Sequence, residues 1–266
     1  MLQRHGPLSK MKTSFDEYVH YILPFEEGDL AIDDWMGERL KLTYTKKIRC
    51  FCGKEKTKVY RQNFCYNCFW EKPQAGAAIF KPEESKAHLG IEDRDLAWEK
   101  EHHVQPHYVY LSYTGALKVG VTRAVNMPYR WFDQGATGAI VIAETPHRHA
   151  AGLIEVALKE HMRDKTNWRA MLKDTPADGV DFLEEARKAV DLLPDDLKEY
   201  ADLSREPMLI KYPVQQYPTK VKSLNLDKSP EFEGVLVGIK GQYLIFEDGT
   251  VFNVRNNEGK IVDLLI

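Results

Sequence analysis

Apolar and polar residues alternate along several short stretches of the chain, and this period of two predicts β-strands. The clearest stretches are LKLTYTKKI near the N-terminus and the pair YVYLS and LKVGVTR, which flank the turn residues YTGA. The pair, within residues 108–123, predicts a β-hairpin. The run GAIVIAE, made of small, β-branched and apolar residues, predicts a buried strand further along.

Helical periodicity replaces this alternation after the hairpin. Asn126 is a plausible cap for a short helix through MPYRWFDQ, which Gly135 would end. Thr145 and Pro146 are suited to open a second helix, as its cap and its first residue. The apolar residues that recur at helical spacing in this second helix are Ala150, Leu153, Ile154, Ala157 and Leu158. Two acidic helices, separated by Pro194, are expected within residues 178–203.

The C-terminal part returns to short β-type stretches, GVLVGI, QYLIFE, TVFNV and KIVDLLI, with a turn at Asp248-Gly249. Residues 1–47 alone offer little core, so the first and last β segments can pack together as one domain. The fold class is therefore expected to be α+β. The expected organisation is a β-rich region (1–47), a cysteine knuckle (48–72), a connector (73–106), a hairpin-helix-strand-helix core (107–172), acidic helices (173–206) and a β-rich module (207–266).

The totals are those of a globular protein, with 43% hydrophobic and 29% charged residues in 266. No apolar run approaches the roughly 18 residues of a membrane helix, and the N-terminal stretch lacks the apolar core of a secretory signal. We therefore expect a cytoplasmic protein without a membrane partner.

Net charge is −3, so overall charge gives no argument for nucleic-acid binding. The distribution is uneven, however. Residues 105–170 contain 8 Lys/Arg and 5 Asp/Glu, whereas residues 174–206 contain 4 Lys/Arg and 11 Asp/Glu. The first segment permits a polyanionic ligand such as DNA or RNA. The acidic helices could dock on a basic protein partner, or they could simply be a solvated surface.

All four cysteines fall within 19 residues, as Cys50, Cys52, Cys65 and Cys68. Two close pairs of thiolates suit the tetrahedral coordination of Zn²⁺, although C-x-C is tighter than the usual C-x₂₋₄-C spacing. A site with four protein ligands is closed, so the zinc would be structural. The alternative is a set of buried or redox-active thiols.

The hairpin and the helices after it carry residues suited to phosphate chemistry. Tyr110 and Tyr108 share one face of the first strand, and Lys118 shares a face of the second with Gly120. Arg130 lies in the short helix and Glu155 in the next one, with Asn167 just beyond it.

This order resembles the GIY-YIG nuclease superfamily, in which such a hairpin supplies tyrosines, the first helix an arginine and a later helix a metal-binding glutamate. Val109-Tyr110 matches the end of the first motif, and Lys118-Val119-Gly120 stands where the second belongs. The resemblance implies catalytic roles for Tyr110, Arg130, Glu155 and the trailing Asn167, and for Lys118 at the position of the second tyrosine. It departs at two positions, because Tyr108 replaces the glycine of the first motif and Lys118 the tyrosine of the second.

Over most of its length the chain looks like an uncharacterised bacterial family, a domain of unknown function. The stretches that carry this resemblance are FCYNCFWEKP, AHLGIEDRDLAWEKEHH, KVGVTR, RWFDQGA and DKTNWRAML.

The implied reaction is metal-dependent hydrolysis of a phosphodiester. Glu155 would hold Mg²⁺ or Mn²⁺, Arg130 would face the growing charge, and Tyr110 would orient or deprotonate water. Lys118, Arg123 and Arg130 would bind phosphate. Simpler roles are open for the same residues: Glu155 could pair with Lys159 one helical turn on, and Tyr110 could be a core aromatic residue. A chain with only these simpler roles would bind nucleic acid or protein without catalysis.

Overall fold

The computed structural model describes residues 2–162 and 167–266. The chain folds into two compact units, and each unit contains segments that are far apart in the sequence. Unit 1 contains the chain up to Phe69, the short segment Leu172–Asp174 and the C-terminal part Lys211–Ile266. Unit 2 contains Trp70–Met171 and Thr175–Ile210. The cysteines therefore lie in unit 1, and the hairpin with its following helices lies in unit 2.

Unit 1 is organised around a long strand, β5 (Arg39–Arg49), in which alternate residues are buried. β5 pairs antiparallel with strands from the C-terminal part on both sides, so that Leu42 lies opposite Leu264 and opposite Phe232. The first and last β segments thus form one sheet. In spatial order its described strands are β1 (Gln3–Pro7), β15 (Lys260–Leu265), β5, β12 (Glu231–Lys240), β13 (Tyr243–Phe246), β14 (Thr250–Asn253) and β11 (Lys222–Ser223), with β6 (Glu55–Lys56) paired to β5.

The turn between β13 and β14 is built by Asp248 and Gly249, as the sequence indicates. The Asp248 carboxylate accepts hydrogen bonds from the Thr250 backbone N–H and hydroxyl, at 2.9 and 2.8 Å. Gly249 has a φ of +81°, a conformation that favours glycine. A second, smaller sheet of unit 1 contains β2 (Lys12–Phe15), β3 (Val19–Leu23) and β4 (Leu30–Ala31).

Unit 2 contains an antiparallel sheet whose described strands, in spatial order, are β10 (Met208–Leu209), β9 (Gly138–Thr145), β7 (His107–Tyr113) and β8 (Leu117–Arg123). β7 and β8 are the predicted hairpin, with Tyr110 opposite Gly120 and Ser112 opposite Lys118. β9 is the predicted buried strand, and Glu144 is its one exposed residue. The α+β class is confirmed.

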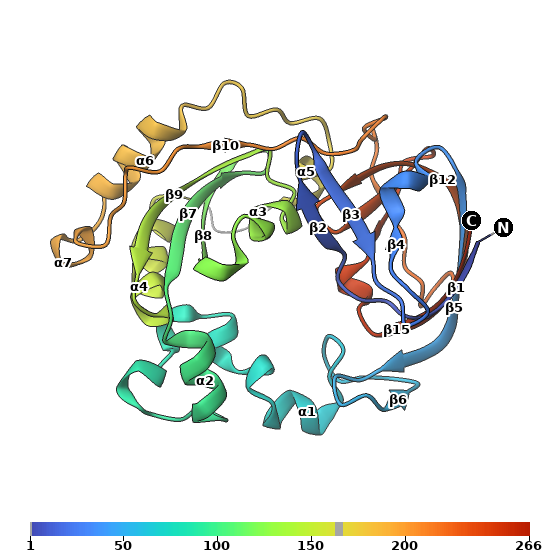
Figure 1. The fold of residues 1–266 in the computed structure, drawn as a ribbon, viewed down its shortest axis with the longest axis horizontal. Helices are drawn as coiled ribbons and strands as arrows, with labels where there is room; N and C mark the ends of the chain where they lie inside the picture. The colour runs from blue at the N-terminus through green and yellow to red at the C-terminus, as the bar shows by residue number, and fades with distance from the viewer. Residues whose placement is uncertain (1, 163–166) are drawn as a thin grey trace. The chain divides into compact units, whose positions relative to one another are not determined.

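Helices cover both faces of this sheet, with α4 (Arg148–Lys159) and α6 (Phe182–Asp191) on one side and α3 (Tyr129–Asp133) on the other (Figure 1). Val109 and Leu111 of β7 pack in one core with Ala151 and Ile154 of α4. Tyr110, which points the opposite way, packs on α3. The other helices of unit 2 are α2 (Leu96–His103), α5 (Trp168–Met171) and α7 (Asp195–Lys198). Pro194 separates α6 from α7, as predicted.

Two predicted helix starts are wrong. α3 begins at Tyr129, and the Asn126 side chain donates a hydrogen bond to the Thr122 hydroxyl instead of capping the helix. α4 begins at Arg148, because Thr145 is the last residue of β9 and its hydroxyl binds the His107 carbonyl at 3.2 Å. The cap is His147, whose Nδ1 accepts the Ala150 N–H at 3.2 Å.

Within residues 2–162 and 167–266, every helix is too short or too polar to cross a lipid bilayer.

Candidate functional site

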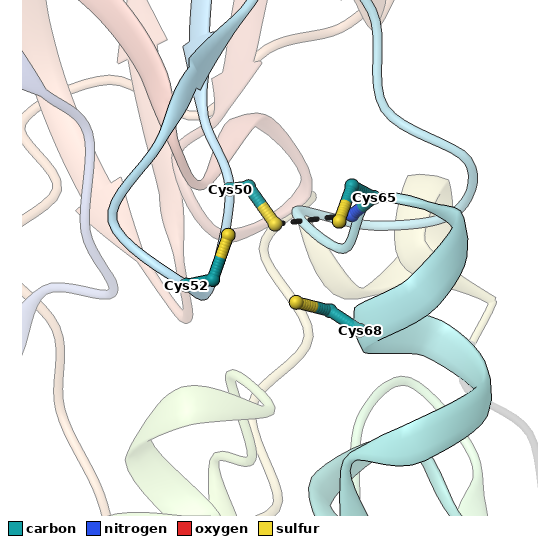
Figure 2. Close-up of side chains that lie close together, drawn as sticks. All are labelled: Cys50, Cys52, Cys65 and Cys68. Carbon is teal, nitrogen blue, oxygen red and sulfur yellow. Dashed lines mark hydrogen bonds between the residues drawn. The ribbon is translucent and has the colours of Figure 1, made fainter.

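The four cysteines form one cluster (Figure 2). Cys50 follows the last residue of β5 and Cys52 lies in the turn before β6. Cys65 precedes the helix α1 (Tyr66–Glu71), and Cys68 lies in its first turn. All four sulfur atoms lie within 4.8 Å of one another. Four thiolates around Zn²⁺ at Zn–S bonds of about 2.3 Å are separated by roughly 3.8 Å, so small adjustments would complete a tetrahedron.

A tight turn explains how the short C-x-C spacing can work. The Gly53 N–H donates to the Cys50 carbonyl at 2.8 Å, and the Cys50 N–H donates to the Lys54 carbonyl at 2.9 Å. Gly53 has a φ of +82°, which lets the chain reverse at once. Cys52 is thereby folded back beside Cys50, and the Cys65 N–H donates to the Cys50 sulfur at 3.1 Å.

Backbone N–H groups and burial act in opposite directions on the thiols. The N–H of Cys68 lowers the pKa of the Cys65 thiol to about 7, and the N–H of Lys54 lowers the pKa of Cys52. Burial raises the pKa of Cys50 and of Cys68. The cluster therefore contains thiols poised to ionise beside thiols that a metal ion would have to deprotonate. Together the four sulfur atoms could bind a metal such as zinc.

In unit 2, Gly120 of the Lys-Val-Gly triplet leaves room for the side chain of Tyr110, the candidate catalytic tyrosine on the neighbouring strand. A Cβ atom on Gly120 would lie 2.6 Å from the Tyr110 hydroxyl oxygen and 2.7 Å from the ring. Tyr110 is fully buried, and its ring meets Trp131 of α3 edge to face at 6.1 Å between centroids. The Tyr110 hydroxyl forms no hydrogen bond with the described residues.

The structure brings Tyr110, Arg130 and Glu155 into one electrostatic cluster. Burial raises the pKa of Tyr110, whereas the adjacent Arg130 guanidinium lowers it. The pKa of Arg130 is raised, first by Tyr110, and Glu155 adds to the effect. Burial also raises the pKa of Glu155. Glu155 additionally contacts Lys159, with Oε2 and Nζ 3.2 Å apart, so the simpler role considered for it is present as well.

The other predicted residues are placed differently. Lys118 is buried on β8, opposite Ser112, and Arg123 ends the same strand opposite His107. Asn167 is exposed, and its Oδ1 accepts the Ala170 N–H at 3.3 Å at the start of α5. In the described part of the chain, no hydrogen bond or ion pair joins Asn167 to Tyr110, Arg130 or Glu155.

Two charged residues of this cluster were missed by sequence reasoning. Arg148 donates to the carbonyls of Ala78 and Ile79 at 2.6 and 2.9 Å, and it interacts with Glu155, Arg130 and Arg123. Burial lowers the pKa of Arg148 to about 10.

Glu83 is the second missed residue. Its charge helps to raise the pKa of Glu155. Its Oε2 is buried and forms no hydrogen bond with the described residues. One signal was available: Gly152 lies inside α4, and a Cβ there would lie 2.2 Å from the Glu83 nitrogen. A glycine inside a helix costs about 1 kcal/mol, so it indicates a close approach of another segment.

The acidic helices carry their own compensating charges. On α6, Lys188 contacts Glu185 at 2.9 Å and Glu184 at 4.0 Å, and Arg187 contacts Glu184 at 3.7 Å. These pairs are consistent with a solvated helical surface.

Comparison with curated proteins finds no match, and comparison with solved structures finds none. A family described as "Protein of unknown function (DUF2797)" matches residues 37–262, which include the cysteine cluster and all the charged residues named above. Because the match spans most of the 266 residues, the chain belongs to this DUF2797 family.

Proposed function

We propose that this protein binds nucleic acid and cleaves phosphodiester bonds in a metal-dependent reaction, through a divergent GIY-YIG-like domain in unit 2. The observation that carries the proposal is that Tyr110, Arg130 and Glu155 come from a strand and two separate helices, yet the charges of Arg130 and Glu155 both act on the pKa of Tyr110. Three arginines lie near Glu155: one of them interacts with the glutamate and with the other two arginines. This excess of positive charge suits a phosphate group. Those arginines are Arg123, Arg130 and Arg148.

Each residue has a defined role in this proposal. Glu155, with Glu83 beside it, would hold Mg²⁺ or Mn²⁺, which would polarise the phosphate. Arg130 would stabilise the negative charge that develops on the phosphate oxygens, and the positive charge of Arg148 would add to this stabilisation. The Tyr110 hydroxyl would orient the attacking water through a hydrogen bond.

The cysteine cluster would hold a structural Zn²⁺. The chemistry of the donors supports this assignment, because four thiolates are a ligand set typical of Zn²⁺ and leave no coordination position open for substrate. The ion would fix the turn after β5 against the start of α1.

A second candidate function is binding without cleavage. The burial of Tyr110 and Lys118, at 0% and 5% exposure, favours it, because a substrate could not reach either side chain without a local rearrangement. The arginines would then contact phosphate only, and binding would weaken with salt by about one unit of log–log slope for each phosphate contact.

Glu155→Gln distinguishes the two candidates. The wild type and the variant are incubated with DNA and RNA substrates in Mg²⁺, in Mn²⁺ and in a chelator. Under the first function, wild-type cleavage requires the metal and Glu155→Gln reduces it to the chelator background, while binding is retained. Glu160→Gln, at the exposed end of the same helix, serves as the matched control. Cleavage that survives Glu155→Gln would overturn the assignment, and salt-dependent binding with no cleavage by the wild type would establish the second function.

A further inference from the structure

Residues 46–69, which contain the end of β5 and the cysteine cluster of the predicted knuckle (48–72), present aromatic rings to solvent. Tyr66 is 62% exposed, Tyr60 is 47% exposed and Phe51 is 45% exposed. Large rings are usually covered in a folded protein, and a group of exposed ones marks a binding surface.

Tyr60 and Tyr66 belong to one cluster of rings. The Tyr60 centroid lies 5.3 Å from that of Tyr66, at an interplanar angle of 80°, and 5.2 Å from that of Phe69. Perpendicular rings leave at least one flat face uncovered by the other. The Arg61 guanidinium lies 5.9 Å from the Tyr60 centroid and 5.5 Å from that of Phe69, which adds a planar cation to the surface.

Backbone hydrogen bonds around the cysteine cluster hold these rings in place. The Tyr60 N–H donates to the Phe64 carbonyl at 2.8 Å, and the Phe64 N–H donates to the Arg61 carbonyl at 2.9 Å. Tyr66 and Phe69 are three residues apart on α1, the helix that carries Cys68. A surface fixed in this way loses little conformational freedom when it binds a ligand.

The same segment is strongly basic in a protein whose net charge is −3. Residues 46–61 contain seven lysines and arginines and one acidic residue, Glu55. Glu55 contacts Lys47 and Arg49, at 3.8 and 3.7 Å. The exposed cations of residues 46–61 without a carboxylate partner among the described residues are Lys46, Lys54, Lys56, Lys58 and Arg61. Even a Zn²⁺ with four thiolates, of charge −2, would leave the knuckle positive.

We propose that this face of the knuckle binds single-stranded nucleic acid, with bases stacked on Tyr60 and Tyr66 and phosphates against Lys54, Lys56, Lys58 and Arg61. Unpaired bases can stack on aromatic side chains, whereas the bases of a duplex are already stacked on each other. An acidic peptide could form ion pairs with the lysines, but its carboxylates would not stack on the faces of the tyrosine rings.

The ligand class is that of the function proposed above, but the residues are different. The two proposals can therefore fail separately: loss of Tyr60 and Tyr66 should impair binding of single strands, and loss of Glu155 should impair cleavage only.

The test is fluorescence anisotropy of the full chain with labelled single-stranded DNA, single-stranded RNA and duplex DNA of about ten nucleotides or base pairs, a length near one binding site. Because each ring would stack on a base, Tyr60→Ala with Tyr66→Ala should weaken single-strand binding by at least about tenfold. The triple change of Lys54, Lys56 and Lys58 to Gln should lower the salt slope by about one unit per lost phosphate contact.

Tyr18→Ala, which changes a tyrosine of unit 1 with 40% exposure outside the knuckle, is the matched control and should bind like the wild type. Metal content and circular dichroism confirm that each variant is folded. Two outcomes would overturn the proposal: duplex binding as tight as single-strand binding, or a folded double variant with unchanged affinity. The DNA and RNA arms decide which single strand is preferred.

Discussion

The cysteine knuckle and the Tyr110–Glu155 cluster are assembled in opposite ways. The knuckle takes its four sulfur atoms from 19 consecutive residues, and most of the side chains around them are exposed. The cluster in unit 2 combines side chains from several elements, and the hydrogen bond from Arg148 to Ala78 joins residues 70 apart in the sequence. Its members rest on a buried apolar core. We infer that the knuckle depends on an ion for its order, whereas the cluster depends on packing.

The two regions would therefore be held in their binding-ready arrangement by different means, one by a bound ion and the other by packing. Around the cysteines, little apolar surface is buried, so under the proposed zinc assignment the free energy of metal binding would largely provide the local stability. Around Tyr110, the strands and helices fix the positions of the charged groups before any ligand arrives, and burial has already shifted the pKa of Tyr110, Arg148 and Glu155. Removal of a metal should therefore affect the two regions very differently.

Loss of a cysteine should have the largest effect. Structural zinc contributes about 10–16 kcal/mol in small zinc-binding modules, so Cys68→Ser should abolish stoichiometric zinc binding and disorder the knuckle. Elemental analysis measures the metal, and hydrogen exchange measures the protection of amides in residues 50–69. Amides of β7 and β9 should keep their protection, because packing holds them.

Asn67→Ser is the matched control, since Asn67 is exposed between Cys65 and Cys68. It should bind one zinc ion like the wild type. If Cys68→Ser also retained stoichiometric zinc and full amide protection, the assignment of the metal ligands would be refuted. If β7 and β9 lost protection together with the knuckle, the contrast between the two regions would be refuted.

Acid should destabilise unit 2 through two buried histidines. Burial, with a smaller contribution from the charge of Arg148, lowers the pKa values of His103 and His107 to about 4. The unfolded chain protonates them near 6.5, so their neutral forms stabilise the fold above that pH. This contribution is lost as the pH falls from 6.5 towards 4. With about 1.4 kcal/mol per pH unit, each histidine costs roughly 2 kcal/mol at pH 5.

Urea unfolding of unit 2 amides at pH 7.5 and pH 5 measures this loss. His103→Asn removes one titrating group but keeps an acceptor or donor for the Ser85 hydroxyl, which lies 3.0 Å from His103 Nδ1. The variant should lose about half of the pH dependence. An unchanged slope would show that His103 is protonated as easily in the folded protein as in the unfolded chain.

The same contrast explains what the sequence could predict. The cysteine cluster and the hairpin were predictable because spacing and alternation are local properties, and both are present. Helix starts were less predictable, because Asn126 and Thr145 have cap-forming side chains that bind Thr122 and the His107 carbonyl instead. A cap competes with partners from neighbouring strands, and the sequence alone does not rank them.

Arg148 and Glu83 could not have been assigned to the cluster in this way. They reach it through the contact of α4 with the segment around Pro82, and no local pattern encodes that contact. Gly152 hinted that something approaches α4 closely, but it did not indicate which segment. The roles of Tyr110, Arg130 and Glu155 were predicted from a resemblance and stay predictions. The structure shows that the charges of Arg130 and Glu155 act on Tyr110.

Tyr110→Phe should have the smallest effect on stability, and it separates a role of the hydroxyl in cleavage from a role in folding. The hydroxyl is buried and meets no partner at full hydrogen-bond geometry in the described structure, although Arg130 and Gln134 lie near enough to lower its pKa. It therefore adds little to stability or lowers it. Its removal should leave the free energy of unfolding unchanged or raise it by up to about 1 kcal/mol, while cleavage should fall if the hydroxyl orients the attacking water. Urea unfolding and the nuclease assay measure the two quantities on the same preparation.

Tyr113→Phe, on the same strand, is the matched control and should not change cleavage. A drop in stability of more than 1 kcal/mol for Tyr110→Phe would make the hydroxyl structural and would place Tyr110 among ordinary core aromatics. Unchanged stability with unchanged cleavage would remove Tyr110 from the mechanism. Lost activity at unchanged or higher stability is the outcome that packing alone cannot produce, because a polar group kept at a cost to the fold indicates selection for what it does.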